Sequence, residues 1–211
     1  YLQQILYWNT QFNLTAITGK EDIQVKHFLD SLTLAMSGIS FKDKNIIDIG
    51  SGAGFPGLAL KIAFPSNYMT LLEATGKKSN FLEQMINILD IKDTIVINSR
   101  AENTAHQSNH REKYNVAISR AVAPLNTLCE LCLPFCGIGG TFIAMKKGEL
   151  TKEIDQSQTA ITVLGGQLDR IIPIRTNNLN DDRKLVLINK IKLTPDTYPR
   201  RPGIPSKKPI M

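Results

Sequence analysis

The sequence predicts an α/β fold: a mainly parallel sheet of seven strands with helices on both faces and an antiparallel hairpin at its end. Two observations lead to this fold class. Short apolar runs alternate with helical stretches from about residue 45 onward, and the last two runs are joined by the polar loop Arg175–Asp182 instead of a helix. Strands joined by helices need right-handed crossovers and therefore pair parallel, whereas strands joined by a loop form a hairpin.

The expected elements follow from the spacing of apolar side chains. Residues 1–40 are an N-terminal helical part, because side chains such as Trp8 and Phe12 recur at helical spacing. Residues 41–193 form a Rossmann-like core, and 194–211 form a basic, proline-rich tail outside the packed fold, all within one domain over residues 1–211. The expected strands cover 46–49, 69–72, 94–98, 116–119, 140–145, 165–174 and 184–191. The expected helices cover about 58–64, 77–89, 125–135 and 149–161.

Composition is that of an ordinary soluble globular domain, with 42% hydrophobic and 21% charged residues. No apolar run approaches the ~20 residues that cross a bilayer, and no signal peptide is evident, so we expect a cytoplasmic protein without a membrane partner. Because the sequence begins with Tyr1, we expect further residues ahead of it. Of the net charge of +6, residues 190–211 carry +5. Such a tail can follow a phosphate backbone or remain solvated, and charge alone leaves both interpretations open.

A glycine-rich loop after the first expected strand is the strongest functional signal. Asp48 lies near the end of that strand, and Gly50, Gly52, Gly54 and Gly57 follow closely. Glycine permits positive φ and lets a ligand approach the backbone without a Cβ in the way. The pattern Asp-x-Gly-x-Gly-x-Gly is usual in methyltransferases, and the terminal hairpin fits their version of this architecture. S-adenosylmethionine is therefore the expected cofactor, with these glycines as binding residues.

A second register of the same loop competes with this interpretation. Residues 52–57 match the dinucleotide pattern G-x-G-x-x-G, and Glu73 lies 21 residues after Gly52, so an NAD-dependent oxidoreductase is the alternative. Asp48 argues against it, because a carboxylate about 4 Å from a pyrophosphate charge costs on the order of 4 kcal/mol at an effective dielectric of ~20. S-adenosylmethionine carries an ammonium and a sulfonium and no phosphate, so an acidic entrance suits it.

Further candidates follow the later strands, at the sheet edge where doubly wound folds hold ligands. Glu73 can accept hydrogen bonds from both ribose hydroxyls, a role that the two cofactors share. Ala101 and Glu102 follow the third strand and are expected on the adenine side of the donor. Arg120 ends the fourth strand and adds a charge at the same edge.

Several methyl-transfer chemistries lack their signatures. Amine methylases carry Asp/Asn-Pro-Pro-aromatic after the fourth strand, where residues 119–122 read Ser-Arg-Ala-Val. Cys129, Cys132 and Cys136 lie on an apolar helix and are expected to be buried thiols, neither a nucleophile nor a metal cluster. No catalytic base is evident, and an acceptor with an available lone pair, such as guanine N7, needs none.

The motifs together resemble the RsmG (GidB) family of bacterial small-subunit rRNA guanine-N7 methyltransferases, over nearly the whole chain. The matching segments are Trp8-Asn9, Phe12–Ile17, Lys26-His27, Asp30–Leu32, Asp48–Leu60, Leu71–Glu73, Lys77–Leu82, Arg100–Glu102, Ser119–Ala121 and Tyr198–Pro209. One departure is the stretch 145–148, Met-Lys-Lys-Gly, where the family more often has lysine directly before glycine. Either Lys146 or Lys147 can therefore fill that role.

The resemblance implies S-adenosylmethionine-dependent methylation of guanine N7 in the decoding-region loop of 16S rRNA, by a cytoplasmic monomer that acts on the small ribosomal subunit. Carried over by position, the donor-pocket residues are Gly50 and Phe55, with Glu73 at the ribose, Ala101-Glu102 at the adenine and Arg120 at the mouth. RNA contacts are hypotheses for Asn13, His27, Arg120, Lys146, Arg200 and Arg201. For His27 a purely structural role is the alternative. A non-catalytic RNA-binding protein on the same fold is the third function class.

Overall fold

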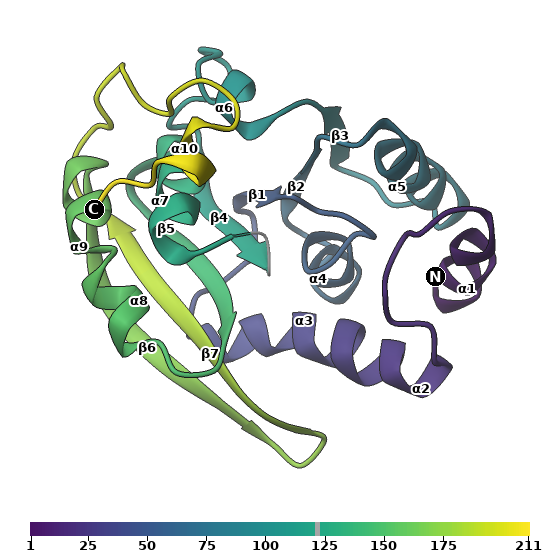
Figure 1. Cartoon of the computed structure of the whole chain (residues 1–211). Coiled ribbons are helices and arrows are strands. Elements are labelled where there is room, and N and C mark those ends of the chain that lie inside the picture. Colours follow the sequence, from purple (N-terminus) through teal and green to yellow (C-terminus); the bar gives the residue numbers. More distant parts are fainter. Residues whose placement is uncertain (121–122) are drawn as a thin grey trace.

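The computed structural model describes residues 1–120 and 123–211, and at its centre lies a seven-stranded sheet (Figure 1). The strands are β1 Asn45–Ile49, β2 Tyr68–Glu73, β3 Thr94–Asn98, β4 Tyr114–Arg120, β5 Cys136–Lys147, β6 Gly166–Thr176 and β7 Leu179–Lys190. Their order is β3-β2-β1-β4-β5-β7-β6. The first five pair parallel, and β7 runs antiparallel to β5 and β6. The predicted fold class, including the terminal hairpin, is confirmed.

The helices agree with the expected alternation and add several short ones. Along the chain they are α1 Leu2–Gln11, α2 Lys20–Ile23, the π-helical η1 Gln24–Leu29, α3 Asp30–Leu32, the 3-10 helix η2 Thr33–Ser37, α4 Gly57–Ala63, α5 Gly76–Ile88, α6 Ala101–Thr104, α7 Leu125–Cys132, the 3-10 helix η3 Leu133–Phe135, α8 Thr151–Asp155, α9 Gln158–Val163 and α10 Ile204–Lys207. The helix expected over 149–161 is thus two helices, α8 and α9. None of the described helices is long and apolar enough to span a membrane.

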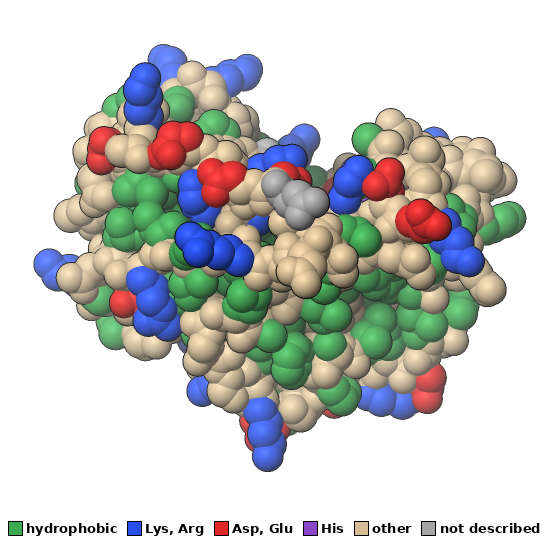
Figure 2. Space-filling model, turned by 90° about the horizontal axis from the view of Figure 1, so that it is seen from below, with side chains coloured by type: hydrophobic (Ala, Val, Ile, Leu, Met, Phe, Trp, Pro, Cys, Tyr) green, Lys and Arg blue, Asp and Glu red, His purple; other side chains and the backbone are tan. Residues whose placement is uncertain are grey.

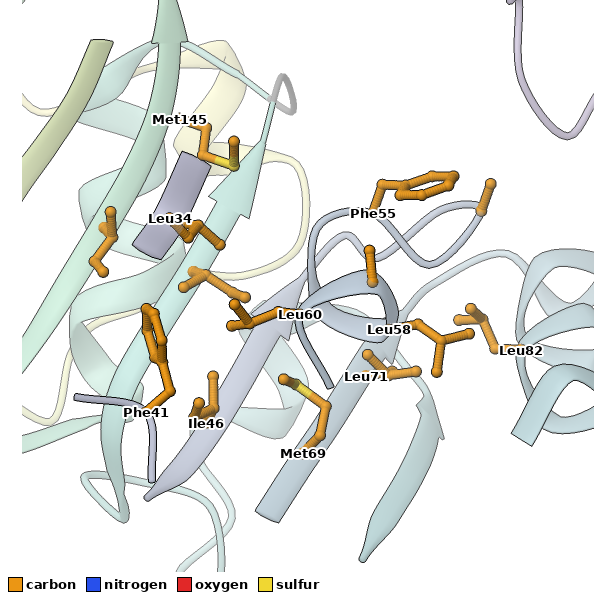
Figure 3. Packing of buried hydrophobic residues seen from close by; sticks show 14 of the residues in the cluster. Leu34, Phe41, Ile46, Phe55, Leu58, Leu60, Met69, Leu71, Leu82 and Met145 are labelled. Carbon is orange, nitrogen blue, oxygen red and sulfur yellow. The ribbon is translucent and has the colours of Figure 1, made fainter. Parts of the chain in front are cut away.

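Two hydrophobic clusters lie on opposite faces of the sheet, because successive side chains of a strand point to opposite sides. On β1, Ile46 belongs to the cluster shared with the N-terminal helices, α4 and α5, whereas Ile47 and Ile49 belong to the cluster shared with α7 and α9. Figure 3 shows the first cluster, including Leu34, Phe41, Leu58, Leu60 and Met69. Helices on both faces leave the carboxyl ends of the parallel strands together at one sheet edge (Figure 1).

The tail differs from the expectation, because residues 194–211 pack against the fold and contain α10, which contacts α7 (Figure 1). The guanidinium of Arg111 donates hydrogen bonds to the carbonyl oxygens of Thr194 at 2.7 Å and Tyr198 at 2.9 Å. The hydroxyl of Thr127 on α7 donates to the carbonyl oxygen of Pro205. Hydrogen bonds to backbone carbonyls thus hold the tail on the fold, although its composition offers little apolar surface. Composition alone does not reveal such bonds.

Candidate functional site

A cleft of about 450 Å³ lies at the carboxyl ends of β1, β2, β3 and β4. We call it the donor cleft, because it contains most residues that the sequence assigns to the methyl donor. Its lining includes six of the eight predicted cofactor residues, namely Gly50, Gly52, Glu73, Ala101, Glu102 and Arg120. The volume is within the range of small-molecule sites, roughly 300–1,000 Å³.

The glycine loop exposes its backbone to the donor cleft. Gly50 and Gly52 have φ angles of 77° and 56°, which favour glycine. A Cβ on Gly52 would meet only the carbonyl oxygen of Gly50, at 3.9 Å, so the space beside it is open for a ligand. The amide of Gly52 donates to Glu73 Oε2 at 2.9 Å, which ties the loop to the end of β2.

Asp48 does not line the donor cleft. It lies on the same face of β1 as Ile46, and its Oδ2 accepts a hydrogen bond from the amide of Gly57 at 2.9 Å. Its side chain is fully buried, and this burial raises the pKa of Asp48 to about 7. Hydrogen bonds from Gly57 and Ser51 lower the pKa but do not outweigh the effect of burial. The carboxyl group therefore holds the two ends of the loop together, and the idea that it faces the donor's positive charges is not supported by its orientation.

Gly54 and Phe55 also lie outside the lining of the donor cleft. A Cβ on Gly54 would collide with the hydroxyl of Tyr1, which donates a hydrogen bond to the carbonyl of Ala53. The ring of Phe55 is buried, stacks on His27 at a centroid distance of 4.7 Å and carries the guanidinium of Arg120 over it at 5.4 Å. Phe55 therefore packs against Arg120, which lines the cleft, and Figure 3 shows the ring of Phe55 in the hydrophobic cluster near Leu58.

Glu73, which the sequence predicts to bind the ribose, lines the donor cleft. Its side chain is buried, with Oε2 accepting from Gly52 and Oε1 accepting from the amide of Thr75 at 2.8 Å. Each carboxylate oxygen has two lone pairs, so one on each remains for a ligand hydroxyl. The two backbone amides fix the direction of the carboxylate toward the donor cleft.

The side of the donor cleft where the sequence predicts the adenine is formed jointly by α6 and the tail. Glu102 is buried, and its Oε1 accepts a hydrogen bond from the amide of Gly203 at 3.0 Å. Gly203 and Ser206 line the donor cleft together with Ala101. The tail thus closes one side of the cleft, a role that the sequence did not suggest because it depends on a contact across 101 residues.

Arg120 stands between the donor cleft and a second cavity of about 410 Å³, and it lines both. Its Nη1 donates to Asp30 Oδ2 at 2.7 Å and to the carbonyl of Lys26 at 3.1 Å, and its Nη2 donates to His27 Nδ1 at 2.9 Å. These contacts join the end of β4 to the N-terminal helices. The next two residues of the predicted motif, Ala121 and Val122, lie outside the described residues.

The second cavity, which we call the acceptor cavity, is lined mainly by charged side chains. Its lining is Ile17, Lys26, His27, Asp30, Arg120, Met145, Lys146, Lys147, Glu153 and Arg183. Five of these side chains are cationic and two are carboxylates, so the cavity favours an anionic ligand. Figure 2 shows Lys and Arg side chains, with Asp and Glu among them, around the hollow at the upper edge of the molecule.

Asp30 and Arg183 were missed by the sequence reasoning as site residues. Asp30 is buried, and its Oδ1 contacts Arg183 at 2.5 Å while its Oδ2 contacts Arg120. Arg183 comes from β7, in the antiparallel hairpin. The only signal in the sequence was that Asp30 belongs to the family-like segment after Lys26-His27. Charge pairing between distant segments leaves no local pattern.

His27 is neutral near pH 7 and both ring nitrogens are engaged. Burial is the main cause that lowers its pKa to about 4, and the positive charge of Arg120 acts in the same direction. Because Arg120 only donates, Nδ1 must accept, and Nε2 then carries the proton and donates to Thr15 Oγ1 at 2.7 Å. The structural role considered for His27 fits this geometry, because a neutral, doubly bonded ring holds Arg120 and Phe55 in place.

Two of the remaining predicted RNA contacts, Asn13 and Lys146, differ in their relation to the cavities. Asn13 is exposed and does not line either cavity. Lys146 and Lys147 both line the acceptor cavity, where Lys146 contacts Glu153 at 2.6 Å and Lys147 contacts Asp181 at 2.7 Å. The structure thus places both lysines at the same cavity.

Arg200 and Arg201 differ sharply although they are neighbours. Nε and Nη2 of Arg200 donate to Glu130, whose side chain is fully buried, and the amide of Arg200 donates to the same carboxylate. Arg201 is exposed. The sequence treated the two as equal RNA contacts, but Arg200 is partly exposed and holds the tail onto α7, whereas Arg201 is exposed.

The three cysteines are buried free thiols, as expected. Burial raises the pKa of each, to about 12 for Cys136, so thiolate chemistry is disfavoured. Among the described residues, no three or more His, Cys, Asp or Glu side chains are grouped so that they could hold a metal ion.

Comparison with known proteins gives one family over most of the chain. The family model described as rRNA small subunit methyltransferase G (GidB) matches residues 1–186. A protein of Dehalococcoides mccartyi named Ribosomal RNA small subunit methyltransferase G is 49% identical over 211 residues, covering 100% of this chain and 89% of that protein.

Solved structures resemble the fold at low sequence identity. A protein of M. jannaschii solved in complex with AdoMet has a TM-score of 0.58 at 12% identity, covering 76% of this chain and 75% of that chain. An rRNA methylase from Streptococcus thermophilus has a TM-score of 0.54 at 20% identity, covering 78% of this chain and 95% of that chain. At these identities the likeness establishes the fold alone.

Proposed function

The chain belongs to the rRNA small subunit methyltransferase G family, and from this premise we propose that it methylates N7 of a guanine in 16S rRNA with S-adenosylmethionine as methyl donor. The guanine belongs to the decoding-region loop of the small ribosomal subunit, and the protein acts as a monomer in the cytoplasm. The support comes from two adjoining cavities whose linings differ in chemistry.

The residues of the donor cleft fit S-adenosylmethionine. Open space beside Gly52 accommodates a ligand, and the remaining lone pairs of Glu73 can accept from two ribose hydroxyls. Glu102 Oε2 faces no described hydrogen-bond donor, which leaves it for the adenine amino group. When bound, S-adenosylmethionine supplies an activated methyl group that a lone pair on nitrogen can accept.

Two titratable groups of the acceptor cavity, His27 and Asp30, are not free to act as a general base. His27 is neutral but has both nitrogens engaged, and Asp30 has both oxygens paired with guanidiniums. Guanine N7 carries a lone pair and no proton, so methylation there requires no proton removal. The protein then only needs to hold the guanine in line with the methyl group. Side chains that are fixed by hydrogen bonds, such as Arg120, serve that purpose.

The single observation that carries this proposal is the position of Arg120. It lines both cavities, and hydrogen bonds to Lys26, His27 and Asp30 fix it there. A methyl donor in the donor cleft and a guanine in the acceptor cavity would therefore meet beside Arg120. The excess of cations around the acceptor cavity suits the phosphates of an RNA strand.

Two measurements test the function. Calorimetry with S-adenosylhomocysteine should show binding by the wild type, strongly weakened binding by Glu73→Ala, and unchanged binding by Glu83→Ala, which changes an exposed carboxylate on α5. Labelled methyl transfer to unmodified small subunits, mapped by primer extension, should then place one 7-methylguanine. Absence of binding at high micromolar concentration, or binding of NADH instead, would reject the methyltransferase assignment. RNA binding without methyl incorporation would favour a non-catalytic protein.

A further inference from the structure

We propose that Glu153 recognises the Watson–Crick edge of the acceptor guanine, by accepting hydrogen bonds from its N2 amino group and N1–H. This inference rests on the proposed function, since it assigns the acceptor cavity to a guanine. It adds a residue that determines which base is methylated, a question on which the donor cleft has no bearing.

Glu153 has one committed and one available carboxylate oxygen. Its Oε1 accepts from the amide of Leu125 at 2.6 Å and contacts Lys146 Nζ at 2.6 Å. Its Oε2 has no hydrogen-bond donor among residues 1–120 and 123–211, and the side chain is 24% exposed at the wall of the acceptor cavity. The two contacts at Oε1 fix the carboxylate, so that Oε2 is held in place for a ligand.

The other carboxylate of the acceptor cavity cannot take this role. Asp30 is 5% exposed, with Oδ1 paired to Arg183 and Oδ2 paired to Arg120. Glu153 is therefore the one acidic acceptor that the described lining of this cavity leaves for a base. An available carboxylate is suited to a neutral ligand edge that carries hydrogen-bond donors.

Guanine has such an edge. It presents N1–H and the N2 amino group as neighbouring donors, whereas adenine has an acceptor at N1 and no amino group at C2. Lys146 makes two contacts, with Glu153 and with the carbonyl of Ala123, and an ammonium has three protons. Its third proton can reach O6, which lies between N1 and N7 on the ring.

The positions of Glu153 and Arg120 relative to the two cavities agree with methylation at N7. Glu153 lines the acceptor cavity but not the donor cleft, whereas Arg120 lines both. A guanine whose N1 and N2 face Glu153 turns the opposite side of the purine, which carries N7, away from that wall. The donor cleft then lies beyond Arg120, on the side where N7 must be.

The test compares nucleotides that differ in one donor group. The full chain saturated with S-adenosylhomocysteine is titrated with guanosine 5′-monophosphate and with inosine 5′-monophosphate, which lacks only the N2 amino group. The wild type should prefer the guanosine nucleotide by about tenfold, and Glu153→Ala and Glu153→Gln should lose that preference. Glu149→Gln, which changes an exposed carboxylate just before α8, the helix that carries Glu153, should keep it.

Methyl transfer to small subunits supplies the second readout. Glu153→Gln keeps a carbonyl oxygen for Leu125 and should fold, yet it should lower kcat/KM by about ten- to a hundredfold with unchanged affinity for S-adenosylhomocysteine. Retention of the wild-type nucleotide preference by both variants would overturn the role of Glu153 while leaving the proposed function intact. Failure of the wild type itself to methylate subunits would reject the proposed function, and the role of Glu153 with it.

Discussion

The guanidinium of Arg120 lies 2.7 Å from the carboxylate of Asp30, and this ion pair joins the end of β4 to the N-terminal helices. The same carboxylate contacts Arg183 of β7 at 2.5 Å. One buried acid thus ties together the parallel part of the sheet, the terminal hairpin and the first forty residues. Arg120 lines both the donor cleft and the acceptor cavity, so in the proposed function this contact sets the geometry in which the methyl donor and the guanine meet.

Replacement of Asp30 by alanine should strongly destabilise the fold. Arg120 would lose its carboxylate partner and Arg183 one of its two, at a site where Asp30 is only 5% exposed, and removing one member of a buried pair costs about 3–5 kcal/mol. Urea unfolding measures the loss. Asp22→Ala is the matched control, because its pair with Lys26 is about half exposed and should contribute about 0.5 kcal/mol or less. Similar losses in the two variants would contradict the structural role of Asp30.

His27 should titrate near pH 4 in an NMR experiment, with the proton of the neutral ring on Nε2. Because its pKa in the folded state is lower than the ordinary 6.5, the stability that it contributes should be lost as the pH falls from about 6.5 through 4. Arg120→Gln removes a positive charge beside the ring and should raise the pKa of His27. An unchanged pKa in that variant would show that the guanidinium does not act on the ring.

Asp48 should make stability fall as the pH rises. Its pKa of about 7 in the folded protein is above the ordinary 3.8, so its contribution is complete below pH 4 and is lost as the pH rises through 7. The unfolding free energy of the wild type relative to Asp48→Asn should therefore fall across this range, by at most about 1.4 kcal/mol per pH unit. A difference that does not change with pH would mean that Asp48 ionises normally.

Arg200→Ala should destabilise the protein by about 3 kcal/mol, because it leaves the fully buried carboxylate of Glu130 without its partner. Arg201→Ala should change stability by less than about 0.5 kcal/mol, since its side chain is exposed. If Arg201 contacts a phosphate of the RNA, the same variant should reduce the salt dependence of RNA binding by about one unit of slope. Thermal unfolding measures the loss of stability, and RNA binding at several salt concentrations measures the phosphate contact. Equal losses of stability in the two variants would contradict the different roles of Arg200 and Arg201.

Two glycines of the donor loop should respond differently to alanine. A Cβ on Gly57 would lie 2.6 Å from Asp48 Cβ and 2.7 Å from Leu71 Cδ2, so Gly57→Ala should destabilise the fold by about 1–3 kcal/mol. A Cβ on Gly52 would meet no close neighbour, and its cost is limited to the positive φ, about 1–2 kcal/mol. Gly52→Ala should instead weaken the binding of S-adenosylhomocysteine, which calorimetry measures directly. A donor affinity equal to that of the wild type would place the ligand elsewhere.

Much of the fold and half of the site follow from local patterns. Apolar runs alternating with helical stretches indicate parallel strands, and parallel strands bring their carboxyl ends to one edge. Gly50, Glu73 and Arg120 each follow a strand, so their convergence on the donor cleft could be predicted without coordinates. The orientation of side chains inside the loop could not, which is why Asp48 and Phe55 were expected to serve the donor and instead hold the loop and its wall.

The sequence by itself determined the class of fold, the glycine loop and the family, because these depend on spacing along the chain. Only the tertiary structure decided which charges pair. The contacts of Asp30 with Arg120, Glu102 with Gly203 and Glu130 with Arg200 join residues 70 to 101 positions apart, and no local pattern encodes such distances. Burial makes these pairs form, since a charge removed from water requires a partner of opposite charge or a hydrogen bond. The tail that composition suggested was outside the packed fold is, for this reason, held against it, and its residues Gly203 and Ser206 line the donor cleft.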